Sequence, residues 1–264
     1  MNPVLAVALA LAPFVVTHLG LAWPPLRQPL VVRLGRLGFI VFFSLVAWLT
    51  FGLAVSSYAA HAAEGPPGLA LGAHGAARTV LIAFIVLGSM LMTGAFGAYT
   101  DSPYALSGRN ASEPRGLARV TRHPFFVGVS LLGGAHALLA THLVGTVFMG
   151  ILGAYALIGA RLQDQKLAAL RGESYARYLA ASSAIPFAAI AAGRQRLVLS
   201  ELPYGAMLLG IPIAALLRAV HGSLFAHGGA FVIAAVVIGP VMILLVELHR
   251  DRRARELATS SAVG

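Results

Sequence analysis

The sequence predicts an all-α fold: a polytopic integral membrane bundle of about seven transmembrane helices. Of its 264 residues, 58% are hydrophobic and only 11% are charged, whereas soluble domains carry about 25% charged residues. The mean hydropathy is +0.83, and apolar runs that approach the roughly 20 residues needed to cross a bilayer recur along the chain. We therefore predict one transmembrane domain over residues 1–248 and a basic cytoplasmic tail over 249–264.

Three spans are predicted in the N-terminal part of the chain. The first, 3–23, carries no charge and lacks the basic start of a cleavable signal peptide, so we interpret it as a true span. A basic loop over 24–36 separates it from the second span, 37–59, which is rich in Phe, Leu and Val. After a Gly/Pro-rich loop over 60–78, the third span covers 79–99. Small residues in its second half allow a neighbouring helix to approach closely.

The fourth and fifth spans, 124–141 and 143–160, are predicted to form a tight antiparallel hairpin. Only Thr141 and His142 separate their apolar runs. Pro124 suits a first helical turn, where its missing N–H is not needed. The hairpin therefore begins immediately after a basic loop.

Residues 161–202 differ from the spans because they are charged. Leu, Tyr and Ala recur there at helical spacing, which predicts an amphipathic segment on the cytoplasmic membrane surface. A break is expected at Arg171 and Gly172. The apolar stretch 185–192 is too short to cross a bilayer and is predicted to be re-entrant or interfacial.

Two further spans complete the predicted bundle. The sixth covers 203–217, with a kink at Pro212, because proline removes a helical hydrogen bond. The seventh covers 229–248, with Pro240 in it. The tail that follows begins basic and ends in small polar residues, which predicts disorder.

The basic residues orient this bundle. If all seven segments cross, the loops 24–36, 100–122 and 161–202 lie on one side with the C-terminal tail, and together they hold 17 of the 19 lysines and arginines. The positive-inside rule then places the C-terminus in the cytoplasm and the N-terminus outside. We interpret the net charge of +10 as topology and contact with anionic headgroups, not nucleic-acid binding. We expect a multi-pass protein of a bacterial inner membrane, and the oligomeric state stays open.

Histidines are the candidate ligands. The chain has nine of them and no cysteine, which excludes disulfides, iron–sulfur clusters and thiolate ligation. Only His18 and His136 lie well inside predicted spans, His136 near mid-membrane, where polar residues often mark function. Neutral imidazoles from two helices can hold haem b iron on its axial faces. Alternatively, each ring hydrogen-bonds a neighbouring helix and binds nothing, or His18 pairs with His123.

Two other groups of residues leave alternatives open. Five histidines lie at or near the predicted outer face and could form a zinc or copper site: His61, His74, His142, His221 and His227. At the cytoplasmic face, Arg122, His123 and Pro124 form either an ordinary helix start or a polar gate or ligand at the mouth of the bundle. Short loops can bring Arg161, Asp164 and Lys166 close to Arg122, or these charges simply face solvent.

Residues 119–136, RVTRHPFFVGVSLLGGAH, followed by IPFAAIAAGRQ at 185–195 and LPY at 202–204, resemble the NnrU family. An apolar first helix with one histidine, here His18, belongs to the same pattern. The resemblance covers about residues 1–220. This family includes the plant and cyanobacterial 15-cis-zeta-carotene isomerases.

The resemblance implies an integral membrane protein and, in the isomerase branch, a haem b cofactor with a lipophilic polyene substrate. The ligand histidines of that branch correspond to His18 and His136, and two further family histidines correspond to His123 and His61. There the reduced haem isomerises a cis double bond without net redox change. In the NnrU branch the implied context is denitrification and nitric oxide metabolism. One departure is Leu19, which stands where the family often has Ser.

A second resemblance connects RHPFFVG and GESYARYL to the isoprenylcysteine carboxyl methyltransferase type. It implies S-adenosylmethionine binding near the cytoplasmic face by His123, Pro124, Gly128 and Glu173. A non-catalytic membrane assembly factor is the third interpretation. In the interpretation as an NnrU-like haem protein, by contrast, Arg122 and His123 lie at the mouth of the haem site.

Overall fold

The computed structural model of the chain describes residues 1–98, 113–239 and 241, and within them every regular element is helical. The predicted all-α class is therefore confirmed. Four described helices are long and apolar enough to cross a membrane: Pro3–Ala22, Pro24–His61, Gly75–Ala95 and Leu143–Arg171. Shorter apolar helices, Pro124–Leu139, Tyr204–Ala219 and Ala226–Gly239, occupy the places of the predicted fourth, sixth and seventh spans.

The first two helices form an antiparallel pair at the N-terminus. Helix α1 (Pro3–Ala22) starts where the Asn2 side chain accepts a hydrogen bond of 2.9 Å from the backbone N–H of Val4. Helix α2 (Pro24–His61) follows after a single residue, so the prediction of a loop over 24–36 is wrong. Pro24 is preorganised for a first helical turn. The helix path bends at Gly35, whose φ of 70° suits glycine.

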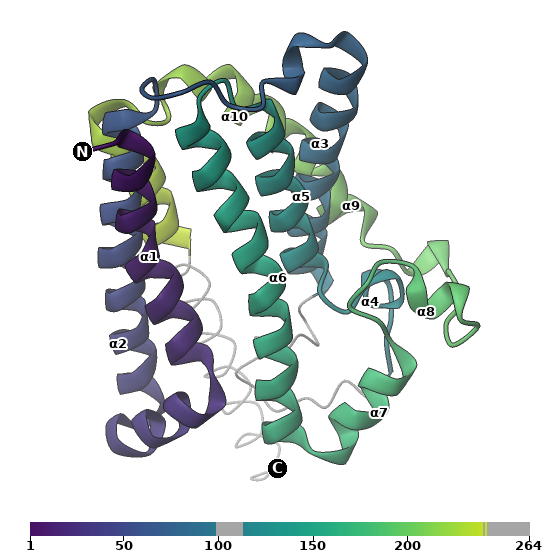
Figure 1. Cartoon of the computed structure of the whole chain (residues 1–264). Coiled ribbons are helices and arrows are strands. Elements are labelled where there is room, and N and C mark those ends of the chain that lie inside the picture. The colour runs from purple at the N-terminus through teal and green to yellow at the C-terminus, as the bar shows by residue number, and fades with distance from the viewer. Residues whose placement is uncertain (99–112, 240, 242–264) are drawn as a thin grey trace, which may run out of the picture.

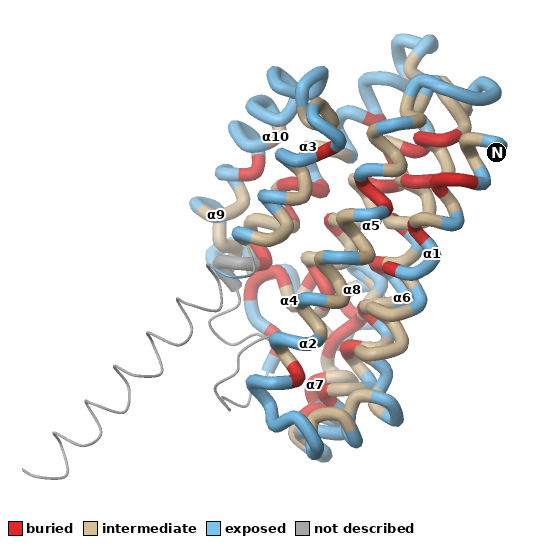
Figure 2. The backbone as a smooth tube through the Cα atoms, turned by 90° about the vertical axis from the view of Figure 1, so that its left-hand side faces the viewer, coloured by how far each residue is buried: buried red, intermediate tan, exposed pale blue. Residues whose placement is uncertain are grey.

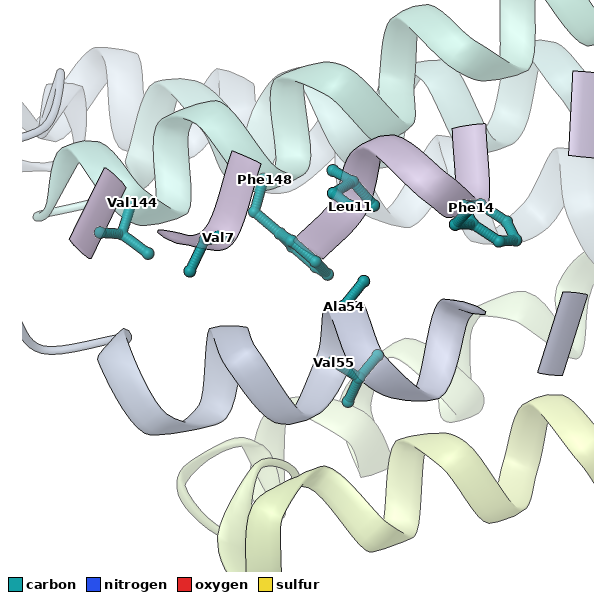
Figure 3. Close-up of a cluster of buried hydrophobic side chains, with 7 residues drawn as sticks. All are labelled: Val7, Leu11, Phe14, Ala54, Val55, Val144 and Phe148. Carbon is teal, nitrogen blue, oxygen red and sulfur yellow. The ribbon is translucent and has the colours of Figure 1, made fainter. Parts of the chain in front are cut away.

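Helices α3 (Gly75–Ala98), α5 (Pro124–Leu139) and α6 (Leu143–Arg171) form the centre of the molecule. In Figure 1, α6 stands between the α1–α2 pair and the α3–α5 pair, and the packing of α1 and α5 on α6 agrees with this. The predicted tight hairpin is confirmed: the Ser130 hydroxyl of α5 donates to the Gly153 carbonyl of α6 at 2.9 Å. Figure 3 shows side chains of α1, α2 and α6 meeting in the core, among them Leu11, Ala54 and Phe148.

Small residues allow the close packing of α3, α5 and α6. A Cβ atom added at Gly88 of α3 would lie 2.7 Å from the carbonyl oxygen of Gly128 on α5. One added at Gly133 of α5 would lie 2.8 Å from the carbonyl oxygen of Met149 on α6. Both contacts are to backbone, so neither can be relieved by a rotamer change. The glycine-rich character of these spans therefore reflects helix–helix contact, as expected in membrane bundles.

The charged segment divides where the sequence predicts. Helix α6 continues through the predicted surface segment to Arg171, and Gly172, with φ of 52°, reverses the chain into α7 (Glu173–Ala181). Tyr175 and Tyr178 of α7 pack against Leu167 of α6 in a small second core. Residues 161–171 are thus the end of a long helix, not part of a separate surface helix.

Short elements complete the fold: η1 (Leu71–Ala73), α4 (Leu117–Val120), α8 (Ala188–Ala191), η3 (Leu199–Glu201), α9 (Tyr204–Leu208), α10 (Gly210–Ala219) and η4 (His221–Ser223). The predicted sixth span is two helices that join at Leu209, because Pro212 lacks the N–H that would bond the Leu208 carbonyl. Helix α10 is exposed along almost its whole length (Figure 2). Pro240 and the tail 249–264 lie outside the described residues.

Candidate functional site at the charged end of the α5–α6 hairpin

Asp164 of α6 organises a cluster of polar side chains at the start of α5. Its carboxylate accepts hydrogen bonds from Arg122 Nε at 3.0 Å and from Arg122 Nη2 at 2.7 Å, which makes a two-pronged ion pair. The Oδ1 atom also contacts His123 Nε2 at 2.8 Å and accepts from the Tyr175 hydroxyl at 2.6 Å. The approach of Asp164 to Arg122, one of the two sequence interpretations, is what the structure contains.

The backbone before α5 fixes Arg122 and His123 in place. The N–H of Arg122 donates to the carbonyl of Ser183 at 2.8 Å, and the N–H of Phe187 donates to the carbonyl of Val120 at 2.8 Å. The buried Thr121 hydroxyl donates to the carbonyl of Ala184 at 2.8 Å. Residues 120–122 and 183–187 therefore run beside each other, which explains why RHP and IPF belong to one site although they lie far apart in sequence.

His123 has a defined ring orientation. It precedes α5 and its side chain is only 2% exposed. Because the ionised Asp164 carboxylate only accepts hydrogen bonds, Nε2 of His123 carries a proton in this contact. The other ring nitrogen, Nδ1, is then the remaining hydrogen-bonding atom of the ring. An imidazole that a carboxylate orients in this way can accept a proton at its free nitrogen.

Helix α7 adds phenol groups that stay protonated. Burial raises the pKa of Tyr175, and its hydrogen bond to Asp164 raises it further. Burial likewise raises the pKa of Tyr178 to about 12. Tyr175 is therefore a permanent donor to Asp164 at neutral pH. The sequence pattern does not single out Tyr175, because its spacing indicates only the apolar face of a surface helix.

A second polar contact braces the same end of the molecule. Glu201 accepts from Arg119 Nε at 2.7 Å and from the N–H of Gly116 at 2.9 Å. Arg119 also donates to Gln195 at 2.8 Å. The hydrogen bond from Arg119 lowers the pKa of Glu201 to about 2. These contacts hold the segment before α5 against the chain after α8.

A pocket of about 830 Å³ opens beside the Asp164 cluster. Its polar end contains Arg122, His123, Arg161, Asp164 and Gln165. Its remaining walls are mostly apolar and come from α5, α6 and the segment before α8: Phe126, Val127, Ser130, Leu131, Leu157, Ala160, Ala184, Ile185 and Pro186. An apolar pocket with a few convergent polar groups is the usual form of a small-molecule site.

The two predicted haem ligands lie in different surroundings. The ring of His18 on α1 packs among Phe14, Phe43 and Tyr155, with centroid separations of 4.5–5.5 Å. Its Nδ1 atom is buried without a hydrogen-bond partner in the described structure. A buried ring nitrogen of this kind is suited to ligate a metal.

His136 lies in the last turn of α5. Its Nδ1 donates to the carbonyl of Leu132 at 2.8 Å, and its ring lies parallel to that of His221, 6.2 Å away. The turn of α5 that contains His136 contacts Thr146 of α6, whereas His18 contacts Tyr155 of the same helix. At 1.5 Å per residue the two histidines therefore differ by about 13 Å along α6.

The other candidate residues are spread over the molecule. His61 ends α2, where its Nδ1 contacts the Ser57 carbonyl at 2.8 Å. Within residues 1–98, 113–239 and 241, no group of three or more His, Cys, Asp or Glu side chains could hold a metal ion, which removes a zinc or copper site built from such residues there. Of the proposed methyltransferase residues, His123 lines the pocket, but Gly128 packs on Gly88 and Glu173 is not among the pocket residues.

Comparison with known proteins places the chain in a family. It matches the NnrU protein family over residues 6–247. It is also similar to the chloroplastic 15-cis-zeta-carotene isomerases of Arabidopsis thaliana, with 36% identity over 113 residues, and of Zea mays, with 33% identity over 112 residues. Each match covers 42% of this chain but only 30% of the relative. No solved structure matches significantly. Because the family match extends over almost the entire chain, this protein belongs to the NnrU family.

Proposed function

We propose that this protein is a membrane-embedded cis–trans isomerase that acts on a long apolar polyene. The observation that carries the proposal is the apolar pocket between α5 and α6. Local similarity to two 15-cis-zeta-carotene isomerases supports the reaction class. Leu157 and Ile185, at the pocket edge, are 57% and 70% exposed. A hydrocarbon can therefore enter laterally from the bilayer without crossing water.

The residues of the pocket bind and orient such a substrate. Phe126, Leu131 and Leu157 supply the contact surface, and burial of apolar area stabilises the complex by about 25 cal/mol per Å². Arg122 and Asp164 neutralise each other at the polar end. This arrangement keeps the apolar walls free of unpaired carboxylate charge.

We further propose haem b as the cofactor, whose iron His18 and His136 would hold. The partnerless Nδ1 of His18 supports this, and so does the Leu132 bond of His136, which leaves Nε2 free, as in many metal-ligating histidines. Each ring could serve as an iron ligand, and because α1 and α5 pack on different sides of α6 (Figure 1), these helices would have to shift for both histidines to reach one iron. Bound haem would supply an iron centre that changes oxidation state.

The membrane arrangement is part of the proposal. Helices 124–139, 204–219 and 226–239 are apolar but shorter than the four long spans. If these three also cross, with locally thinned bilayer around them, the chain has seven spans with its N-terminus outside. The concentration of basic residues on one side supports this orientation. A bacterial inner membrane is the location that we propose.

The direct experiment is isomerisation of a 15-cis polyene by haem-loaded proteoliposomes, followed by chromatographic separation of the isomers. We expect conversion by the native chain and loss of conversion in H18A and H136A, with H74A as the matched loop-histidine control. The absorbance spectrum gives a second readout: the Soret band should weaken or shift in H18A and H136A only. A spectrum without a Soret band contradicts the haem proposal. Bound haem without conversion contradicts the isomerase and favours the nitric oxide role.

A further inference from the structure

Charge at the mouth of the α5–α6 pocket is unbalanced. Among the residues that line it, Arg122 and Asp164 form an ion pair of 2.7 Å. Arg161 also lines the pocket, yet no hydrogen bond or ion pair to its side chain is present within the described part of the chain. Among the described residues, the polar end of the pocket thus carries one exposed guanidinium, that of Arg161, without an ion-pair partner.

The pocket has a polar end and an apolar depth. On α5 it extends from His123 to Leu131, which is about 12 Å at the rise of an α-helix. On α6 it extends from Asp164 to Leu157, or about 10 Å. Every charged lining residue lies at the same end, beside Arg122. This gradient matches a molecule with one charged end and one apolar end.

We propose that the pocket binds an amphiphile with an anionic head, a carboxylate or a phosphate, that pairs with Arg161 while its apolar chain lies along Phe126 and Leu131. Guanidinium groups bind both anions through two parallel hydrogen bonds. The apolar polyene proposed above uses only the apolar walls of the pocket, so an anionic head adds a contact to Arg161 that a hydrocarbon does not make. A zwitterionic head brings an ammonium group next to two arginines. The inference concerns binding alone and does not rest on isomerase activity or on haem.

The test uses cis-parinaric acid, a fluorescent polyene carboxylate, and its methyl ester as the neutral match. Both are titrated into the full-length protein in a non-ionic detergent. We expect the native chain to bind the acid with enhanced fluorescence and R161Q to bind it about tenfold more weakly, which corresponds to about 1.4 kcal/mol. The ester should bind both proteins equally. The matched control is R177Q, which replaces an exposed arginine on α7 outside the pocket. This variant should bind the acid as tightly as the native chain does.

Competition identifies the source of the anion. Displacement of the probe by phosphatidylglycerol but not by phosphatidylcholine supports the site and indicates a membrane lipid. Displacement by oleate alone supports the site and indicates a free acid. Equal displacement by the two phospholipids, equal affinity of acid and ester, or unchanged affinity in R161Q overturns the proposal. Circular dichroism confirms that R161Q remains helical.

Discussion

At the scale of single residues, Asp164 is the group on which the candidate site depends. It joins the segment before α5 to α6 and α7 through Arg122, His123 and Tyr175. Both partners of the Arg122 ion pair are largely buried, with side chains 15% and 16% exposed. Loss of one partner in such a pair leaves the other charge without compensation, which costs far more than loss of a surface pair.

Replacement of Asp164 by Asn is therefore expected to lower the free energy of unfolding by about 3 kcal/mol. Thermal unfolding in detergent, followed by tryptophan fluorescence, measures the change. E173Q is the matched control, since Glu173 begins α7 and is exposed. A melting temperature of D164N equal to that of E173Q would show that the carboxylate does not hold the cluster together.

The raised pKa of the Tyr175 phenol leads us to predict a specific loss of stability at alkaline pH. Folding raises the pKa of its phenol above the ordinary value of 10.0, so the unfolded chain loses this proton first. The stabilisation is complete below about pH 10 and decreases as pH rises further. We expect the melting temperature of the native chain to fall more steeply above pH 10 than that of Y175F. Parallel pH profiles for the two proteins would contradict this role of Tyr175.

At the scale of elements, the sequence predicted helices correctly wherever an apolar run was bounded by a proline, a glycine or a short turn. Pro124 and the Thr141–His142 turn bound α5 and the start of α6, and Gly172 ends α6 as expected. The helical segment after Pro24 was missed because its arginines resemble a loop. The backbone conformation of Gly35 separates helix 24–34 from helix 36–61, and amino-acid composition does not reveal such a conformation.

Glycine contacts between helices predict opposite effects for two neighbouring substitutions. G133A places a Cβ atom 2.8 Å from the Met149 carbonyl oxygen, whereas a Cβ atom at Gly134 meets no atom within 4 Å. We expect G133A to destabilise the protein by about 1–3 kcal/mol and G134A to stabilise it slightly, since alanine favours helix. Unfolding midpoints measure both. Similar midpoints for the two variants would mean that α5 and α6 are not closely packed.

At the scale of the whole molecule, the sequence predicted the membrane class and offered the Arg122–Asp164 approach as one of two interpretations, but it did not predict the full site. Tyr175 joins the cluster only because the chain reverses at Gly172 and returns along α6. His18 and His136 both lie inside predicted spans, yet α6 lies between their helices. Depth along a helix can be read from the chain, whereas the face toward which each helix turns depends on packing.

The absence of cysteine makes the proposed topology directly measurable. Single cysteines at Ser174 and Ser223 are predicted to lie on opposite sides of the membrane, since Ser174 follows α6 and Ser223 follows α10. A membrane-impermeant maleimide should label S223C in intact cells and S174C only after permeabilisation. Labelling of both from the same side would show that α9 and α10 do not cross.

The central claim is that a lipophilic substrate reacts in the pocket between α5 and α6. Conversion of a 15-cis polyene by proteoliposomes that contain A160F tests it most directly, because this substitution fills the pocket from a buried position on α6. L170F, at an exposed position on the same helix outside the pocket, is the control. We predict at least a tenfold loss of conversion in A160F, with unchanged haem absorbance and normal conversion in L170F. Equal conversion by folded A160F and L170F would contradict the account.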